Sequence, residues 1–302
     1  MTTRKIKKVA ILGSGVMGSR LACHFANIGV KTYLLDIVTP NLPEDQQQIA
    51  AARNGLVNKA LETAIKSNPS PVYHKDVVKL ITTGNFDDNL KWISEVDWIL
   101  EAVVENLEIK QSLYEKVEQF RKPGTLVTSN TSGIPISWMA KGRSDDFRKH
   151  FCGSHFFNPP RYLRLLEIIP TAETSPEVVD FLMQYGSLHL GKTTVKCKDT
   201  PAFIANRVGI YSIMAIFKLM GEMGLSIEEV DLLTGPLTGK PKSATFRTSD
   251  VVGLDTMIKV LQGAYDNLPN DEYRDVLQVP AWILKMNENK WIGDKVGQGF
   301  GR

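Results

Sequence analysis

Short apolar runs alternate with amphipathic stretches over the first half of the chain. Residues 9–12 form an apolar run that stops at a glycine-rich loop, and a stretch with helical spacing follows. A second strand is predicted over residues 31–36, and residues 96–104 form a mostly apolar run, typical of strands buried on both faces. A helix over residues 106–120 and a strand over 125–129 come next. This alternation predicts a parallel α/β sheet.

A polar, helix-prone segment interrupts the alternation beyond the second strand. It extends over about residues 40–79 and is rich in Gln, Ala, Asn and Lys. The pattern predicts an inserted arm with one long helix and part of another, before a short strand over residues 80–83.

The pattern changes about two thirds of the way along the chain. Residues 203–223 are apolar on nearly every face, which predicts a helix that is buried or lies in an interface. Ser226 and Glu229 have the spacing of a capping box, and helical spacing continues with no convincing strand. We therefore predict an α/β domain over residues 1–199 and an all-α domain over residues 200–302.

Composition and charge narrow the class of protein. The 302 residues are 43% hydrophobic and 23% charged, as in folded soluble proteins, and the net charge of +3 argues against a dedicated nucleic-acid binder. The longest apolar stretch, residues 208–217, is about half of the roughly 20 residues that a membrane span requires. The three cysteines are widely spaced and suggest neither a disulfide framework nor a zinc site. We expect a cytoplasmic protein with no metal site, no membrane span and no nucleic-acid partner.

The glycine-rich loop carries the first chemical signal. Gly13 permits a tight turn, Gly15 lets backbone approach a pyrophosphate, and Gly18 lets the helix pack closely on the strand. The amides at the helix N-terminus, where Val16 and Met17 lie, would hold the phosphates.

Asp36 follows this loop by about 20 residues, at the end of the second predicted strand. Its carboxylate would accept hydrogen bonds from the ribose of an adenine dinucleotide and would repel a 2′-phosphate. The strand, loop, helix and acidic residue together predict a Rossmann-type domain that binds NAD rather than NADP. The alternatives are an ordinary glycine turn and an ordinary carboxylate at a strand end.

A second signal surrounds Asn158-Pro159-Pro160, where two β-prone runs flank a strong turn sequence. If the chain folds back near residue 161, His155 and Glu167 come opposite each other, with Cβ atoms roughly 4.5–5.5 Å apart. A carboxylate that holds one imidazole nitrogen orients the other and raises its basicity, as a general base for alcohol oxidation requires. A core histidine bonded to a turn carbonyl is an equal alternative on spacing alone.

Two further groups of polar residues lie where packing does not require them. Residues 129–132 follow a buried strand, at the edge where open α/β sheets bind ligands; a Ser/Thr turn or helix cap is the alternative. Asn206 and Arg207 interrupt the apolar start of a helix, and would line a cleft between the domains or face solvent.

Several of these blocks resemble the 3-hydroxyacyl-CoA dehydrogenase family of fatty-acid β-oxidation. The His-Phe-Phe-Asn-Pro and Lys-Asp-Thr-Pro blocks are far more specific than the glycine loop. The resemblance implies a Rossmann-type parallel sheet with an inserted helical arm, then an all-α domain. It also implies NAD-dependent oxidation of (S)-3-hydroxyacyl-CoA to 3-ketoacyl-CoA. The matching stretches lie in the same order over essentially the whole chain: residues 12–18, 104–107, 129–132, 155–159, 198–207, 252–256 and 297–300.

The resemblance assigns roles by matching position. His155 would be the catalytic base, and Glu167 would orient it. Ser132 and Asn206 would bind the reacting oxygen of the substrate, with Ser132 also near the cofactor. The other matching positions near the cofactor, alongside Asp36, are Glu105, Lys110, Asn158 and Lys295.

The inserted arm resembles the CoA-contacting segment of the family. Lys66 falls where a lysine meets the CoA, and Lys59 and Arg53 would complete a patch for its phosphates. A solvated helix face is the alternative for each of these residues singly.

The turn over residues 239–247 departs from the shorter mitochondrial-type enzymes and resembles the bacterial and archaeal multifunctional branch. In that branch an enoyl-CoA hydratase domain follows the dehydrogenase, so the chain is either a complete enzyme or part of a longer one. The resemblance implies an acyl-CoA substrate and a homodimer formed through the helical domain. It leaves the acyl-chain length open.

Two rival interpretations are weaker. Another two-domain Rossmann dehydrogenase, of the 3-hydroxyacid or glycerol-phosphate type, would use a lysine as its acid/base. A non-catalytic protein of the same fold, like the lens crystallin that resembles this family, need not keep His155 and Glu167. The presence of both residues argues against each alternative.

Overall fold

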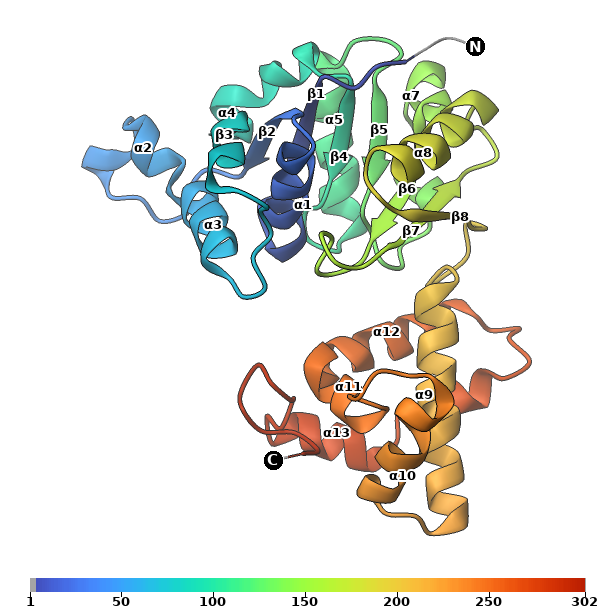
Figure 1. Cartoon of the computed structure of the whole chain (residues 1–302). Coiled ribbons are helices and arrows are strands. Elements are labelled where there is room, and N and C mark those ends of the chain that lie inside the picture. Colours follow the sequence, from blue (N-terminus) through green and yellow to red (C-terminus); the bar gives the residue numbers. More distant parts are fainter. Residues whose placement is uncertain (1–3, 302) are drawn as a thin grey trace. The chain divides into compact units, whose positions relative to one another are not determined.

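The computed structural model describes residues 4–301, which divide after Asp199 into an α/β unit and a helical unit (Figure 1). An eight-stranded sheet with the order β3-β2-β1-β4-β5-β6-β7-β8 forms the centre of the first unit. The fold class predicted from the sequence, a mostly parallel sheet followed by a helical part, is confirmed.

The strands β1 to β6 are all parallel, whereas β7 is antiparallel to β6 and parallel to β8. The carboxyl ends of six strands therefore meet at one edge of the sheet, which is where open α/β sheets bind ligands. The strands are β1 (Lys8–Leu12), β2 (Lys31–Asp36), β3 (Ile81–Asn85), β4 (Trp98–Glu101), β5 (Leu126–Ser129), β6 (Phe151–Phe156), β7 (Leu165–Pro170) and β8 (Thr193–Lys196).

Helices cover both faces of this sheet. One face packs against α1 (Val16–Asn27), α3 (Gly55–Lys66) and α8 (Pro176–Leu188) in a single apolar cluster. On the other face, α5 (Leu107–Phe120) and α7 (Asp145–Lys149) contribute Tyr114 and Phe147, whose rings pack with that of Phe151. Because both faces are covered, every residue of β4, β5 and β6 is buried. The short α6 (Ile136–Met139) follows β5.

The inserted arm differs from the prediction, because its expected long helix is broken at Asn54. The Thr39 amide and hydroxyl both donate to the Arg53 carbonyl oxygen, at 2.9 and 3.0 Å, and the hydroxyl oxygen accepts from the Leu56 amide at 2.9 Å. Thr39 therefore ends one helix and starts the next. The elements of this region are η1 (Glu44–Gln46), α2 (Ala50–Arg53), α3, η2 (Lys75–Leu80), α4 (Phe86–Asn89) and η3 (Leu90–Glu95).

Several elements have no counterpart in the predicted pattern, among them α8 and β8, which return the chain beside β7. In addition, β4 occupies only four of the nine residues in its predicted apolar run.

The helical unit packs around an apolar core that includes Phe217 and Phe246, with ring centroids 4.8 Å apart. The capping box predicted at Ser226 is present. Near the end of the chain, the buried Asp250 carboxylate accepts hydrogen bonds from the Phe300 and Gly301 amides. The elements are α9 (Ala205–Met223), α10 (Ile227–Thr234), η4 (Pro236–Thr238), α11 (Phe246–Val252), α12 (Leu254–Asn267), η5 (Arg274–Leu277) and α13 (Ala281–Glu288).

Only one face of α9 is covered within its own unit. Ile210, Met214 and Phe217 are buried, whereas several large apolar residues on the helix are exposed. In the part of the chain that the structure describes, no helix has the length and apolar character needed to cross a membrane.

Candidate active site

The glycine-rich loop joins β1 to α1 at the carboxyl edge of the sheet. Gly13 has a φ of +100°, and a Cβ there would lie 2.6 Å from the Ala102 carbonyl oxygen. A Cβ on Gly18 would lie 1.8 Å from the Gly13 carbonyl oxygen. A Cβ on Gly15, in contrast, would meet nothing within 4 Å. The loop is therefore packed tightly on its inner side and open on the side where a pyrophosphate would approach.

Asp36 is fixed beside this loop by Ser14, a residue that the sequence did not single out. One carboxylate oxygen accepts hydrogen bonds from the Ser14 amide at 2.5 Å and from its hydroxyl at 2.6 Å. The other oxygen accepts from the Ile37 amide at 2.7 Å. Because the N-cap of α1 is Gly15, no side chain caps the helix, and its first amides remain available to an anion. These residues fit the phosphates and ribose of a dinucleotide.

The strands β6 and β7 place His155 directly opposite Glu167. The His155 Nδ1 and a Glu167 carboxylate oxygen lie 2.7 Å apart, within hydrogen-bond distance. Both side chains are buried, with 5% and 1% of their surfaces exposed. A carboxylate at this distance favours the tautomer that carries its proton on Nδ1, and leaves Nε2 as the basic nitrogen.

The strand end that carries His155 is fixed from two sides. The Phe156 amide donates to the Asn130 side-chain oxygen at 2.9 Å. Beyond the strand, the Asn158 side-chain oxygen accepts a hydrogen bond from Arg20 on α1. Asn158, a predicted cofactor residue, is therefore tied to the helix that begins at the glycine-rich loop. Asn130 belongs to the polar block at residues 129–132 that the sequence indicates as a ligand-binding edge, whereas no pattern in the sequence indicates Arg20.

A buried cluster of charged residues lies behind this edge of the sheet. Glu101, at the end of β4, accepts hydrogen bonds from Lys110 at 2.7 Å, Tyr114 at 2.9 Å and Ser129 at 2.6 Å. Burial, and next the charge of Glu101, raise the pKa of Tyr114 well above its ordinary value. The Lys110 ammonium is buried between Glu101 and Glu105, and lies 3.4 Å from the Glu105 carboxylate. Lys110, a predicted cofactor residue, is therefore buried and contacts two carboxylates of this cluster.

Glu105 holds the turn that carries Ser132. One carboxylate oxygen accepts hydrogen bonds from the Thr131 hydroxyl at 2.5 Å, the Ser132 amide at 2.9 Å and the Gly133 amide at 3.2 Å. Burial would raise the pKa of Glu105, but the Lys110 charge and these hydrogen bonds outweigh it and lower the pKa overall. Glu105 is therefore ionised at neutral pH, as a residue that binds three donors requires.

The arm presents a smaller basic patch than the sequence suggested. Arg53 is ion-paired with Asp88, whose carboxylate oxygens lie 2.7 and 2.9 Å from the guanidinium nitrogens, so its charge is already compensated. Lys66 is exposed on α3 and paired with Glu62 one turn earlier, while Lys59 is exposed. Arg53 is therefore a poor member of the predicted phosphate patch, and Lys59 and Lys66 remain as its candidates.

Two predicted site residues belong to the helical unit. Asn206 lies in the first turn of α9, next to Arg207, which pairs with Asp271. The Lys295 ammonium lies 2.8 Å from Asp255 and 2.9 Å from the Thr256 hydroxyl, within the Gly-Leu-Asp-Thr block.

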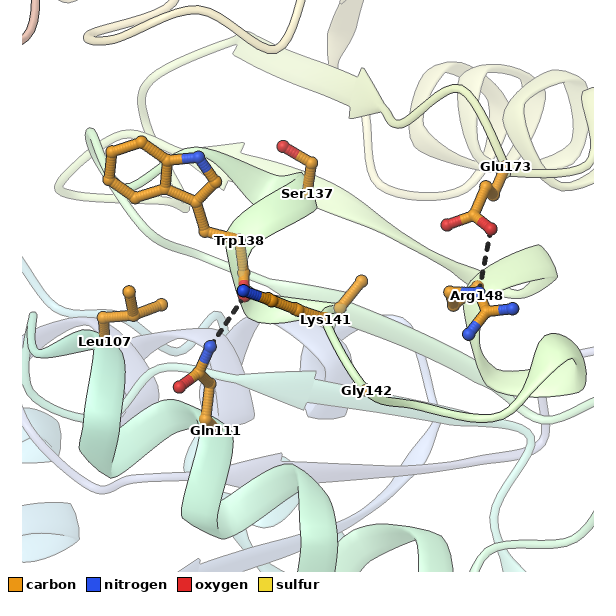
Figure 2. Close-up of a pocket in the computed structure, with 9 residues that line it drawn as sticks. Leu107, Gln111, Ser137, Trp138, Lys141, Gly142, Arg148 and Glu173 are labelled. Atoms are coloured by element: carbon orange, nitrogen blue, oxygen red, sulfur yellow. Dashed lines mark hydrogen bonds and ion pairs between the residues drawn. The ribbon is translucent and has the colours of Figure 1, made fainter.

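A hollow of about 590 Å³ lies apart from all of these residues, beside α5 and α6 (Figure 2). Three of its polar side chains already bond within the protein. The Gln111 amide donates to the Trp138 carbonyl oxygen at 2.8 Å, and Arg148 pairs with Glu173 at 2.9 Å. None of the catalytic, cofactor or substrate residues predicted from the sequence lines this hollow.

Comparison with protein families gives two matches. The NAD binding domain of 3-hydroxyacyl-CoA dehydrogenase matches residues 8–200, and the C-terminal domain of the same enzyme matches residues 203–302.

Individual proteins are similar over nearly the whole chain. A probable 3-hydroxyacyl-CoA dehydrogenase of Bacillus subtilis (strain 168) is 48% identical over 98% of this chain, which spans 38% of that protein. A protein of the same description from Deinococcus radiodurans is 43% identical over 98% of this chain and 82% of its own length. The crystal structure of FadB2 from M. tuberculosis has a TM-score of 0.79 at 26% identity and covers 98% of both chains.

Proposed function

The chain belongs to the 3-hydroxyacyl-CoA dehydrogenase family of NAD-dependent oxidoreductases, and we propose that His155 and Glu167 form its general-base pair. The proposed reaction is the oxidation of (S)-3-hydroxyacyl-CoA to 3-ketoacyl-CoA in fatty-acid β-oxidation. The observation that carries the proposal is the buried contact of 2.7 Å between the His155 imidazole and the Glu167 carboxylate. It supplies the oriented base that the reaction needs.

His155 takes the proton of the C3 hydroxyl group on Nε2 as the C3–H bond breaks. NAD, when bound, supplies the acceptor for the hydride. The imidazole becomes positively charged in this step, and the Glu167 carboxylate stabilises that charge across the Nδ1 hydrogen bond. In the reductive direction the same imidazolium returns the proton to the ketone oxygen.

The other predicted residues bind the cofactor and the substrate and orient them for the reaction. The glycine-rich loop and Asp36 hold the adenosine half of the dinucleotide, and Glu105 and Asn158 lie toward its other half. Ser132 and Asn206 donate hydrogen bonds to the C3 oxygen, which stabilises negative charge there in the reductive direction. The contact between Glu105 and the Ser132 amide supports this assignment, because it fixes the turn that carries the Ser132 hydroxyl.

The exposed ammonium groups of Lys59 and Lys66 bind the CoA phosphates in this proposal. The acyl-CoA substrate places the protein in lipid metabolism, and bacterial relatives favour the cytoplasm as its location. We further propose a homodimer formed through the helical unit. A fused hydratase domain is proposed for a longer form of the protein, since the chain spans 38% of the Bacillus subtilis relative and 40% of a putative trifunctional enzyme from Rickettsia felis.

A direct assay tests the reaction. The purified protein is given NAD with (S)-3-hydroxybutyryl-CoA, and the absorbance of NADH is followed. We expect turnover, and reduction of acetoacetyl-CoA by NADH in the opposite direction. The (R)-enantiomer serves as the matched control and should be a poor substrate. No NADH formed from the (S)-enantiomer, together with no NADH consumed by acetoacetyl-CoA, would overturn the proposal.

A further inference from the structure

Lys192 is a buried lysine that the proposed mechanism does not use. It lies between α8 and β8, and only 5% of its surface is exposed. Burial lowers the pKa of its ammonium to about 8, and no carboxylate of residues 4–301 offsets this effect. Buried ammonium groups are usually paired with an opposite charge, because desolvation is expensive. A buried ammonium group without a carboxylate partner therefore indicates that the position of the charge is important.

The Lys192 ammonium binds the turn between β6 and β7. It donates one hydrogen bond to the Pro160 carbonyl oxygen and another to the Leu163 carbonyl oxygen, the latter at 2.8 Å. The next amide along the chain, that of Thr193, donates to the Arg164 carbonyl oxygen at 2.7 Å. Three carbonyl groups of one turn are thus held by two consecutive residues. Bonds from a charged donor are roughly twice as strong as neutral ones.

This turn connects the two strands of the candidate general-base pair. It begins beyond His155 and contains Asn158, the predicted cofactor residue that Arg20 also binds. On its far side the chain enters β7 and reaches Glu167. A displacement of the turn would therefore change the positions of His155 and Asn158 together.

Among the charged groups around the turn, Lys192 is the one that binds the carbonyl groups of Pro160 and Leu163. From α1, the His24 ring contacts the Leu190 carbonyl oxygen, and burial, together with the Lys192 charge, lowers the pKa of His24 to about 4. His24 is therefore neutral at pH 7. From β6, the Phe156 ring lies 5.9 Å from the ammonium. Within the turn, the Arg161 guanidinium donates instead to the Ser70 and Val72 carbonyl oxygens of the arm region.

We propose that Lys192 is a positioning residue for the dehydrogenase reaction, because its ammonium fixes the β6–β7 turn and so sets the positions of His155 and Asn158. This inference rests on the function proposed above. Loss of the proton from Lys192 weakens both hydrogen bonds and loosens the turn. Activity that depends on the turn therefore declines as the pH rises through the region near 8. Misplacement of reacting groups by about 1 Å can lower a rate by roughly 10²-fold.

Three variants test this role: Lys192→Met, Lys192→Arg and, as a matched control, Lys196→Met at an exposed lysine on β8. We measure kcat for reduction of acetoacetyl-CoA by NADH from pH 6.5 to 9.5, and the affinity for NADH. At pH 7, Lys192→Met should lower kcat by about tenfold or more. The Kd for NADH should change by a smaller factor, because the glycine-rich loop and Asp36 hold the adenosine half of the cofactor independently of Asn158. Lys196→Met should match the wild type.

The arginine variant separates positioning from a general loss of packing. Its guanidinium stays charged over the whole pH range, so it should retain more activity than Lys192→Met. The ratio of wild-type to Lys192→Arg kcat should fall as the pH rises from 7 to 9.5. Any pH dependence of kcat that the two proteins share cancels in this ratio. A ratio independent of pH, or a Lys192→Met kcat within twofold of the wild type, would overturn the proposal.

A spectroscopic measurement keeps the test independent of turnover. The proton between His155 and Glu167 should give a downfield NMR signal, identified by its loss in His155→Ala. We expect Lys192→Arg to move or broaden this signal at pH 7 and Lys196→Met to leave it in place. A signal unmoved in Lys192→Arg at all pH values contradicts positioning. An inactive wild-type protein, in contrast, contradicts the proposed function and not the position of the turn.

Discussion

The contacts of Asp36 with Ser14 hold the glycine-rich loop against the end of β2. We propose that the same carboxylate binds the adenosine ribose of NAD and repels the additional phosphate of NADP. In this proposal, selection between the two cofactors and the shape of the loop depend on one residue.

Replacing Asp36 by alanine should relax the preference for NAD. We expect the ratio of kcat/KM with NADPH to that with NADH to rise by about tenfold, since relief of a charge–charge repulsion of about 1.4 kcal/mol corresponds to such a factor. Steady-state kinetics with both cofactors measures the ratio. Asp45→Ala, at an exposed aspartate, is the control. Persistent discrimination against NADPH would exclude Asp36 as the selecting residue.

Glu105 should make stability depend on pH. Its pKa is lower in the folded protein than in the unfolded chain, so it stabilises the fold above the ordinary glutamate pKa of about 4.3. That contribution is lost as the pH falls through the lowered value. We therefore expect Glu105→Gln to lower the urea midpoint at pH 7, and the difference in midpoint from the wild type to narrow as the pH falls below about 4.3. A difference that stays constant down to the lowest pH at which both proteins fold would assign the stabilisation to another interaction.

The residues that could be predicted are those whose partners are set by local rules. The turn at Asn158-Pro159 fixed an antiparallel register that brings His155 opposite Glu167. Glu101 and Lys192 could not be found in this way, because their partners lie on other elements and their significance depends on burial. A charged residue in a linear sequence is normally expected at the surface.

At the scale of elements, the arm shows how a distant side chain fixes a break between two helices. Residues 50–66 are mostly helix-forming apart from Asn54-Gly55, and at that point Thr39 binds both the Arg53 carbonyl oxygen and the Leu56 amide. The chain therefore turns at Asn54, and α3 starts in a new direction that presents Lys59 and Lys66. The Asn54-Gly55 pair is a turn signal from which the break could have been predicted, whereas its partner Thr39 lies 15 positions earlier and could not.

Removing the hydrogen bonds of the Thr39 hydroxyl group should weaken CoA binding and leave the cofactor site intact. Thr39→Val removes the hydroxyl group with little change in volume, and each lost hydrogen bond is worth about 1 kcal/mol. We expect the KM for acetoacetyl-CoA to rise three- to tenfold, and the KM for NADH to stay within twofold of the wild type. Thr238→Val, at an exposed threonine whose hydroxyl donates to the Gly235 carbonyl oxygen in the helical unit, is the control. An equal rise in both KM values would contradict a separate role for the arm.

The strands also differ in how far the local sequence predicts them. The parallel central strands could be predicted because burial on both faces produces continuous apolar runs, as in residues 9–12 and 96–104. In β8 the residues are only partly buried or exposed, so the run is short and mixed in character. Its place in the sheet comes from pairing with β7, which no local pattern encodes.

At the scale of the whole molecule, α9 carries an apolar surface that its own unit does not cover. Val208, Leu219 and Met223 are exposed by 62%, 51% and 66%. Val208 lies three turns before Leu219, and Met223 one turn after it, so the three residues share one face of the helix. Exposed apolar surface of this kind favours association.

We therefore predict a dimer in solution. Light scattering should give twice the 33.7 kDa mass of the chain, and Leu219→Glu should shift the protein toward the monomer because it introduces a charge into the interface. Lys218→Ala, at the neighbouring exposed position, is the control. A monomeric mass for the wild type would contradict the prediction.

The central claim is that His155 is the base of an NAD-dependent dehydrogenase, and one comparison tests it most directly. Turnover of acetoacetyl-CoA with NADH is measured for the wild type and His155→Ala, with NADH affinity determined on the same samples. We expect turnover to fall by roughly 10²–10⁴-fold, the usual contribution of a general base, with the NADH Kd within twofold of the wild type. Turnover of His155→Ala within threefold of the wild type would contradict the account.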